Sequence, residues 1–267
     1  KGSHYGDVDV AEQLTDAAVR FIEENRERPF FLYLAHWDVH TPIRARRKVV
    51  ARYEAKLAKT GGDWNPTYAG MIEAVDTSVG RVRAALAEHG LTDNTLVVFT
   101  SDNGGLPRVT NNAPLHGGKG SLFEGGIRVP MWASWPGVIE PGTTTEEPVL
   151  SVDFLPTFAE ITGAPLPANQ PVDGRSIVPI LRGEAVDERA VFWHFPLYLA
   201  GGEGNLVLPI SGTDRLYWRG VPASAIRHGD WKLIHYFEDD SVKLFNLADD
   251  LSESRDLATA EPERARA

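Results

Sequence analysis

The chain has 267 residues, a formal net charge of −10 at pH 7 and no cysteine. This length can bury a sizeable core, as one large domain or as a domain with a smaller companion. The acidic balance argues against nucleic acid as the main partner, because phosphate binding needs a basic surface, and the lack of cysteine excludes disulfides and thiolate metal sites.

Neither a membrane-spanning helix nor a leader peptide is visible in the sequence. No apolar run approaches the roughly 20 residues of a membrane span, and Lys1 is not followed by the apolar core of a signal peptide. The chain begins without a methionine and enters a predicted helix almost at once. We therefore expect it to be a piece of a longer protein.

The first hundred residues predict an alternation of helices and strands. Asp9, with Glu12 three residues on, has the spacing of a capping box that starts the first helix. In chain order we expect a helix ending near Arg28, a fully apolar strand at 30–35, an exposed basic helix at 44–59, an amphipathic helix at 68–86 closed by His89 and Gly90, and a buried strand at 96–99. This order is typical of a doubly wound α/β sheet with parallel strands.

Polar side chains collect where the two predicted strands end. His36 and His40 follow the first strand, and Asp102 and Asn103 follow the second. The carboxyl ends of strands are where open α/β sheets bind ligands. A carboxylate next to an amide oxygen offers hard ligands suited to Ca²⁺ or Mg²⁺. The same residues followed by two glycines can also form a plain turn, and both interpretations stand at this point.

A second glycine-rich segment follows at 116–120 and carries Lys119. Such a loop can aim the lysine at an anion, while the alternative is an exposed loop lysine without a ligand. The order of the segments favours a ligand site. A buried strand, an acid–amide pair and a glycine loop with a lysine precede Glu-Gly-Gly-Ile-Arg-Val-Pro at 124–130, and another apolar run comes next.

The remaining chain predicts the end of one domain and the start of another. Residues 131–135 should form a strand, 152–161 a helix interrupted by Pro156, and 177–181 a helical turn. From residue 184 we expect a small antiparallel sheet, with strands at 190–195, 224–227, 231–236 and 242–246 and turns at 228–230 and 239–240. The long segment 197–221 is expected to be a functional or disordered loop. The predicted domains are 1–183 and 184–267.

The segments 99–105, 117–120 and 124–130 resemble the C-terminal half of the type I sulfatases. These are formylglycine-dependent sulfate ester hydrolases of the alkaline phosphatase superfamily. The resemblance extends over essentially the whole chain. It implies an α/β fold with a doubly wound, alkaline-phosphatase-like sheet that is incomplete here, followed by a small C-terminal antiparallel α+β subdomain.

The resemblance also implies roles for individual residues. Asp102 and Asn103 correspond to two metal ligands, and Lys119 to a catalytic cation that contacts the sulfate. His40, in the family's His-Thr-Pro signature, corresponds to a residue that touches the sulfate and protonates the leaving oxygen, a role that histidine side chains often have in catalysis. His194 lies in a segment similar to one near the pocket mouth of polysaccharide-acting members. It is our candidate for substrate recognition, with a packed sheet residue as the alternative.

Two positions bear on which branch of the superfamily this is. Phosphatase relatives tend to carry histidine after the aspartate and to bind two Zn²⁺, whereas Asn103 suits a single hard cation. That favours a sulfatase with one Ca²⁺, or alternatively Mg²⁺. His116 departs from the arginine expected before Gly-Gly-Lys, which puts an anion-binding role at this position in doubt. His36 matches nothing in the family and is interpreted as structural.

The family's nucleophile segment, Cys-x-Pro-x-Arg, does not occur in these residues, nor does the acidic pair that normally precedes it. We therefore expect formylglycine in a missing N-terminal part and expect the 267 residues alone to be inactive. The full-length form is predicted to remove sulfate from sulfated carbohydrate, with another sulfate ester as a possible substrate. Family resemblance predicts a periplasmic or extracellular location.

Two alternatives to the sulfatase interpretation remain open. One is a phosphodiesterase or phosphonate monoester hydrolase of the same superfamily. The other is a non-catalytic relative that binds sulfated glycans but has lost the nucleophile. Hydrolysis of aryl sulfates against aryl phosphate diesters, and binding without turnover, separate the three. The sequence does not determine the oligomeric state.

Overall fold

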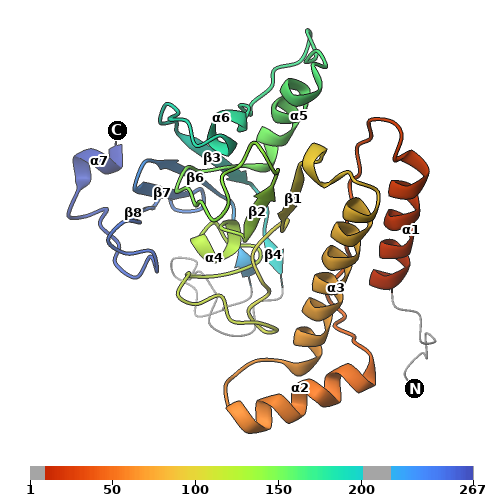
Figure 1. Ribbon diagram of the computed structural model, residues 1–267. Helices are drawn as coiled ribbons and strands as arrows, with labels where there is room; N and C mark the ends of the chain where they lie inside the picture. Colours follow the sequence, from red (N-terminus) through yellow and green to blue (C-terminus); the bar gives the residue numbers. More distant parts are fainter. Residues whose placement is uncertain (1–9, 201–217, 267) are drawn as a thin grey trace. The chain divides into compact units, whose positions relative to one another are not determined.

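The computed structural model describes residues 10–200 and 218–266 (Figure 1). The chain divides into two compact units, one of residues 1–95 with 108–111 and one of residues 96–107 with 112–267. This division differs from the predicted domain boundary at 183, which stays a prediction. The expected capping box at Asp9 lies outside the described residues.

The described part of the first unit is helical. It contains α1 (Val10–Asn25), α2 (Arg47–Thr60), α3 (Pro66–Glu88) and the short 3₁₀ helix η1 (Thr92–Asn94), and α3 packs against both α1 and α2. The apolar face of α1 buries Ala18 and Ile22, and the buried Thr15 hydroxyl lies 2.7 Å from Ser78 Oγ on α3. No side chain of α2 is buried, which confirms the expected exposed helix. Asn65 caps α3 by accepting hydrogen bonds from the backbone of the first turn.

The predicted strand at 30–35 is wrong, because these residues belong to no helix or strand. Their exposure alternates with a period of two, and Phe31 and Tyr33 are 66% and 81% exposed. A strand needs a hydrogen-bonded neighbour, and the described residues of this unit supply none. The fully apolar run therefore indicated neither the alternating exposure of this segment nor its lack of a strand partner.

In the second unit, β1 (Val97–Thr100) and β2 (Met131–Ser134) form a two-stranded sheet. The predicted strand positions are confirmed, but the pairing is antiparallel, with Val97 opposite Ser134 and Thr100 opposite Met131. The expected burial on both faces is also wrong, since β1 is only half-buried. The rings of Phe99 and Trp132 stack across the pair at 5.4 Å.

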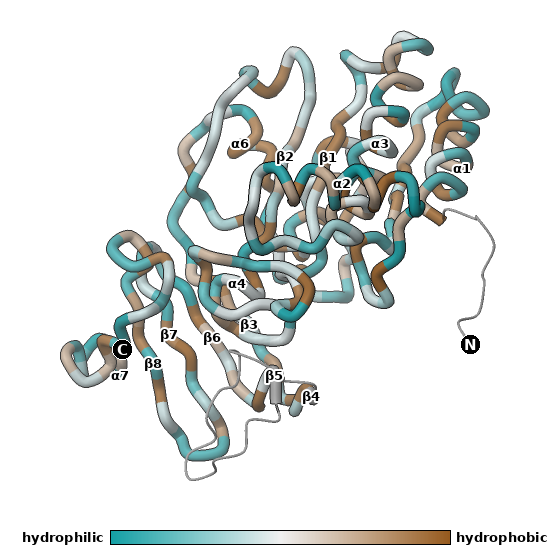
Figure 2. Tube along the Cα trace, turned by 90° about the horizontal axis from the view of Figure 1, so that it is seen from below, coloured by the Kyte–Doolittle hydropathy of each residue, from teal (hydrophilic) through white to brown (hydrophobic). Residues whose placement is uncertain are grey.

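The predicted C-terminal antiparallel sheet is confirmed. Its order is β3 (Val191–Phe195), β6 (Ala223–His228), β7 (Trp231–Tyr236) and β8 (Val242–Asn246), and every pair is antiparallel. Buried and half-buried residues alternate along β7 and the first part of β6. Figure 2 shows hydrophobic and hydrophilic residues mixed along β6, β7 and β8. One face packs on a core cluster of Phe123, Val221, Ala223, Ala225, Ile234, Tyr236, Phe245 and Leu247. Two further short strands, β4 (Leu199–Ala200) and β5 (Trp218–Gly220), pair at the ends of the predicted 197–221 loop, whose central residues 201–217 lie outside the described range.

The second unit also contains short helices. They are α4 (Glu124–Ile127), η2 (Ser151–Asp153), α5 (Phe154–Thr162), α6 (Val178–Leu181) and α7 (Pro262–Arg266). Pro156 does not interrupt its helix as predicted, because it lies in the first turn of α5, where no intrahelical bond needs its missing N–H. In the part of the chain that the structure describes, no helix is long and apolar enough to cross a membrane.

Candidate active site

The loop after β1 carries the predicted metal ligands. Asp102 is exposed and Asn103 is half-buried, and Ser101 Oγ donates to the Asn103 carbonyl at 3.0 Å. Gly104 N donates to Gly126 O at 2.9 Å. A backbone hydrogen bond therefore fixes the loop of the acid–amide pair to α4, which lies more than twenty residues further along the chain.

The lysine loop is hydrogen-bonded directly to the metal-ligand loop. Lys119 N donates to Gly105 O at 3.0 Å. The side chain of Asn112 bonds both loops, since its Oδ1 accepts from Gly105 N at 3.1 Å and its Nδ2 donates to Gly105 O and Gly117 O at 2.9 and 3.2 Å. Asn112 is a positioning residue that the sequence interpretation missed. Its only signal was an amide lying between two glycine-rich segments.

Backbone contacts explain why this region is rich in glycine. A Cβ atom on Gly104 would lie 1.7 Å from Gly125 O, and one on Gly126 would lie 2.1 Å from Ser121 O. Real contacts of this kind are never so short, so neither position accommodates a side chain. The glycines let the two loops and α4 approach backbone to backbone.

The charges of Asp102 and Lys119 are not engaged by ion pairs within residues 10–200 and 218–266. An aspartate and a lysine on adjoining loops, each without such a partner, can serve a bound cation and a bound anion. The oxygen donors of Asp102 and Asn103 fit Ca²⁺ or Mg²⁺. They fit as part of a shell, since Ca²⁺ takes six to eight oxygens and the described residues contain no group of three acidic, histidine or cysteine side chains placed to hold a metal.

His40 belongs to the first unit. Its side chain is exposed, and Nδ1 lies 2.7 Å from the carbonyl oxygen of Thr41. A carbonyl only accepts, so Nδ1 carries the proton and Nε2 is the ring nitrogen left for a ligand. Its nearness to Lys119 stays a prediction. His36 Nε2 lies 2.9 Å from Ser78 Oγ, and burial lowers the pKa of His36, both as expected of a structural residue.

His194 lies on β3 with its side chain exposed, which does not support the alternative of a packed sheet residue. Nδ1 is 2.8 Å from Ser224 Oγ on β6, and the imidazole lies 5.7 Å from the ring of Phe237. The end of β3 adjoins the lysine loop. A Cβ on Gly220 would lie 2.2 Å from the carbonyl oxygen of Gly120 and 3.3 Å from the ring of Phe195, the residue after His194.

His116 packs on Phe123, with ring centroids 4.2 Å apart. Burial lowers the pKa of His116, and the nearby Lys243 and Lys232 lower it further. A lowered pKa disfavours the charged imidazolium, whereas an arginine would stay charged. The environment is therefore in line with the doubt that the sequence raised about an anion-binding role here.

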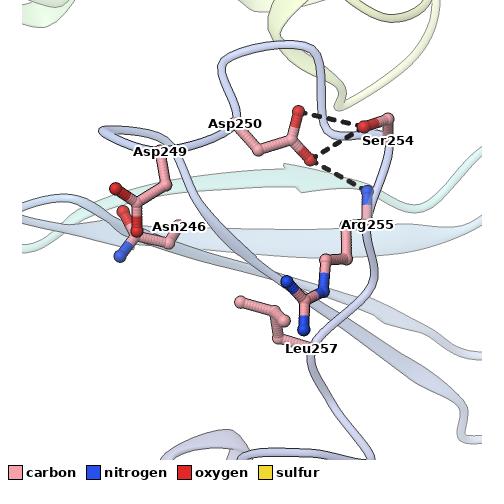
Figure 3. Close-up of a pocket in the computed structure, with 6 residues that line it drawn as sticks. All are labelled: Asn246, Asp249, Asp250, Ser254, Arg255 and Leu257. Atoms are coloured by element: carbon pink, nitrogen blue, oxygen red, sulfur yellow. Dashed lines mark hydrogen bonds between the residues drawn. The ribbon is translucent and has the colours of Figure 1, made fainter.

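A pocket of about 290 Å³ lies in the C-terminal segment and contains none of the predicted site residues (Figure 3). Its lining is Asn246, Asp249, Asp250, Ser254, Arg255 and Leu257. The carboxylate of Asp250 accepts from Ser252 Oγ at 2.6 Å, from Ser254 Oγ at 3.2 Å and from Arg255 N at 2.8 Å. The bond from Ser252, followed by the others, lowers the pKa of Asp250. This carboxylate shapes its own loop.

A family model described as Sulfatase matches residues 8–164 of the chain. The chain belongs to the sulfatase family. The match spans β1, both glycine-rich loops and α4, and thus the residues that hold Asp102, Asn103 and Lys119 together.

Relatives of known name carry the same description. The sulfatase of Formosa agariphila is 38% identical and the alignment covers 95% of this chain and 46% of the relative. Human steryl-sulfatase is 33% identical over 71% of this chain and 33% of its own length. The chain thus spans about half, or less, of the length of these sulfatases.

Solved structures share the fold. The crystal structure of Ps i-CgsB in complex with k-i-k-neocarrahexaose superposes with a TM-score of 0.77 at 33% identity, covering 96% of this chain and 52% of that one. A sulfatase structure from Bacteroides fragilis gives a TM-score of 0.72 at 22% identity. These likenesses confirm the predicted α/β, alkaline-phosphatase-like fold class. This sulfatase chain contains both helices and antiparallel sheets.

Proposed function

We propose that the full-length protein is a sulfuric ester hydrolase that removes sulfate from sulfated carbohydrate. The observation that supports this is a backbone hydrogen bond between the two loops. Lys119 N donates to Gly105 O at 3.0 Å, in the loop that carries Asp102 and Asn103. A sulfate monoester is a charged and sluggish electrophile, so its hydrolysis requires cations around the sulfonate oxygens and an acid for the departing alkoxide. The two loops combine a metal-ligand pair with a cationic side chain.

Each candidate residue has a role in this proposal. Asp102 and Asn103 would hold a divalent cation, for which Ca²⁺ is our first choice and Mg²⁺ the alternative. When bound, such a cation supplies positive charge against the sulfate oxygens. Lys119 binds a sulfate oxygen. His40, as an imidazolium whose Nδ1–H bonds to the Thr41 carbonyl, gives its Nε2 proton to the leaving oxygen. The nucleophile, expected as formylglycine, is assigned to the part of the protein outside these residues.

His194 is proposed to contact the sugar. Its exposed imidazole beside Phe237 offers a hydrogen-bonding group and an aromatic ring, the combination on which sugars bind. The Ps i-CgsB structure, 33% identical, is described as a complex with a neocarrahexaose. That likeness supports a sulfated oligosaccharide as the substrate class. A periplasmic or extracellular location is proposed with it, on the resemblance to the sulfatase family.

The test is hydrolysis by the natural full-length protein, matured in a host that produces formylglycine. Release of inorganic sulfate from an aryl sulfate and a sulfated oligosaccharide is compared with cleavage of an aryl phosphate diester. We expect preference for the sulfates, and a loss of about 10²-fold or more in kcat/KM for Lys119→Ala and Asp102→Ala. Lys59→Ala and Asp63→Ala are matched exposed controls and should retain activity.

Two other outcomes would contradict this assignment. Preference for the phosphate diester would favour the phosphonate monoester hydrolase alternative. The chain resembles a solved phosphonate monoester hydrolase structure from Silicibacter pomeroyi in fold only, at 22% identity. Binding of sulfated glycan without sulfate release would favour the non-catalytic relative. The 267 residues by themselves should release no sulfate.

A further inference from the structure

Three charged side chains from distant parts of the second unit are buried together. Lys232 on β7, Glu124 at the start of α4 and Glu253 in the C-terminal loop are 0%, 2% and 3% exposed. Lys232 Nζ lies 2.8 Å from a carboxylate oxygen of each glutamate. The other carboxylate oxygen of Glu253 accepts from the backbone N of Glu124 at 2.6 Å. We call these three residues the buried triad.

The buried triad is expensive to maintain. Charges removed from water lose hydration, and a buried ion pair often contributes no more stability than apolar residues of the same volume. Two carboxylates here share one ammonium, with Arg128 at 3.6 Å from Glu124 as the further cation. Glu253 also has a φ of +51°, a backbone conformation that is uncommon for a residue with a side chain. Stability alone therefore explains this arrangement poorly.

What the buried triad holds is α4, and α4 holds both site loops. Within this short helix, Gly126 O accepts from Gly104 N in the metal-ligand loop at 2.9 Å. Gly125 N donates to the carbonyl of His116, which begins the lysine loop, at 2.7 Å. Glu124 precedes these two glycines directly. A displacement of Glu124 is therefore transmitted through one or two peptide units to both loops.

We propose that Lys232 and Glu253 are positioning residues, which anchor Glu124 and so fix the metal-ligand pair Asp102–Asn103 relative to Lys119. They touch neither substrate nor metal and act through the backbone of α4. This inference rests on the proposed function, because it assigns a task to the buried triad within that same site. Outer partners of this kind typically contribute about 10- to 100-fold to metal affinity or activity.

The experiment uses the full-length enzyme with Glu253→Gln as the principal variant and Lys232→Met as the second. Glu253→Gln keeps the shape and leaves the Lys232–Glu124 pair neutral in sum, so it should fold. The matched control is Arg189→Met, which breaks another ion pair of the same unit, with the buried Asp153. The side chains of that pair also form hydrogen bonds with Leu150, Arg175 and Pro148, which belong to neither glycine loop. Calcium affinity is measured by titration calorimetry, alongside kcat, KM and thermal melting.

We expect Glu253→Gln to weaken Ca²⁺ binding and to lower kcat by about 10- to 100-fold. Arg189→Met should lower the melting temperature at least as much, yet leave Ca²⁺ affinity and kcat within about twofold. If Lys232→Met does not fold, Glu253→Gln decides alone. A Glu253→Gln enzyme that loses only thermal stability, with wild-type Ca²⁺ affinity and kcat, overturns the inference.

The failures of the two proposals are distinguishable. If the wild-type enzyme releases no sulfate, the proposed function fails, and Ca²⁺ affinity alone still tests the buried triad. If the wild-type enzyme is active and Glu253→Gln equals it in both readouts, only the buried triad's positioning role fails.

Discussion

Replacement of Gly126 by alanine should separate α4 from the lysine loop. The added Cβ would lie 2.1 Å from Ser121 O and 2.7 Å from Gly118 O, whereas ordinary contact begins at about 3.4 Å. Both obstacles are backbone atoms, which cannot rotate away as a side chain would. The helix or the loop must therefore shift by about 1.3 Å or bend, in a region where the interior is closely packed.

The size of the effect follows from that displacement. Overpacking of this kind costs about 1–3 kcal/mol of folding free energy, and a misplacement of about 1 Å in a catalytic arrangement costs about 10²-fold in rate. We expect Gly126→Ala to lose both, as measured by urea unfolding of the full-length protein and by kcat/KM for sulfate release. The matched control is Gly80→Ala, in the middle of α3 with open space around it, which should stabilise by about 0.5–1 kcal/mol and leave activity unchanged.

Gly126→Ala would refute the reasoning if it kept more than about a third of the wild-type kcat/KM and an unfolding free energy within about 0.5 kcal/mol of wild type. A difference of that size is ordinary for surface substitutions. Such a result would mean that the close approach of α4 and the loop is not needed to hold Lys119. Loss of stability with full activity would refute the catalytic half alone.

Three further predictions can be measured on the same protein. Burial by itself would raise the pKa of Asp153, but hydrogen bonds from Arg189 and from two backbone N–H groups lower it overall. The ionised carboxylate therefore stabilises the fold above its unfolded pKa, and this stability is lost as the pH falls through the folded pKa. Asp153→Asn should cost about 3–5 kcal/mol of unfolding free energy in urea at pH 7, and a cost below about 1 kcal/mol would contradict this. Burial lowers the pKa of His36, so the wild-type protein should lose stability as the pH falls through the unfolded histidine pKa of about 6.5. The His36→Gln variant should lose less stability over the same pH range. Parallel curves of stability against pH for the two proteins would contradict this prediction. Chelation of divalent cations should abolish sulfate release and lower the unfolding free energy by about 2.7 kcal/mol relative to a cation concentration 100 times Kd, and an unchanged melting curve would argue against a bound metal.

Local patterns in the sequence determined much of the fold. The helices α1, α2 and α3 follow from their apolar or basic periodicity, and the strands of the C-terminal sheet follow from alternation and turn residues. The loop residues Asp102, Asn103 and Lys119 were selected from their position after a predicted strand and from resemblance, and the family match covers them. Even Lys232 left a signal, since it shares the inward register of β7 with Ile234.

Pairing over distance was not determined by the sequence. The segments 30–35 and 97–100 are both largely apolar, yet only the second forms a strand, because the tertiary structure supplies it with the neighbour β2. An apolar run states that a segment is suited to burial. Which segment it pairs with, and in which direction, depends on contacts that no local pattern encodes.

The union of the site is likewise a product of tertiary structure. Three features join residues that are separated along the chain. They are Asn112 between the two loops, α4 between the loops and the C-terminal sheet, and Lys232 between two glutamates. The sequence by itself determined which residues carry the charge and the metal-binding oxygens. Only the tertiary structure decided how they are held, because backbone hydrogen bonds and buried ion pairs form between segments that meet only when the chain is folded.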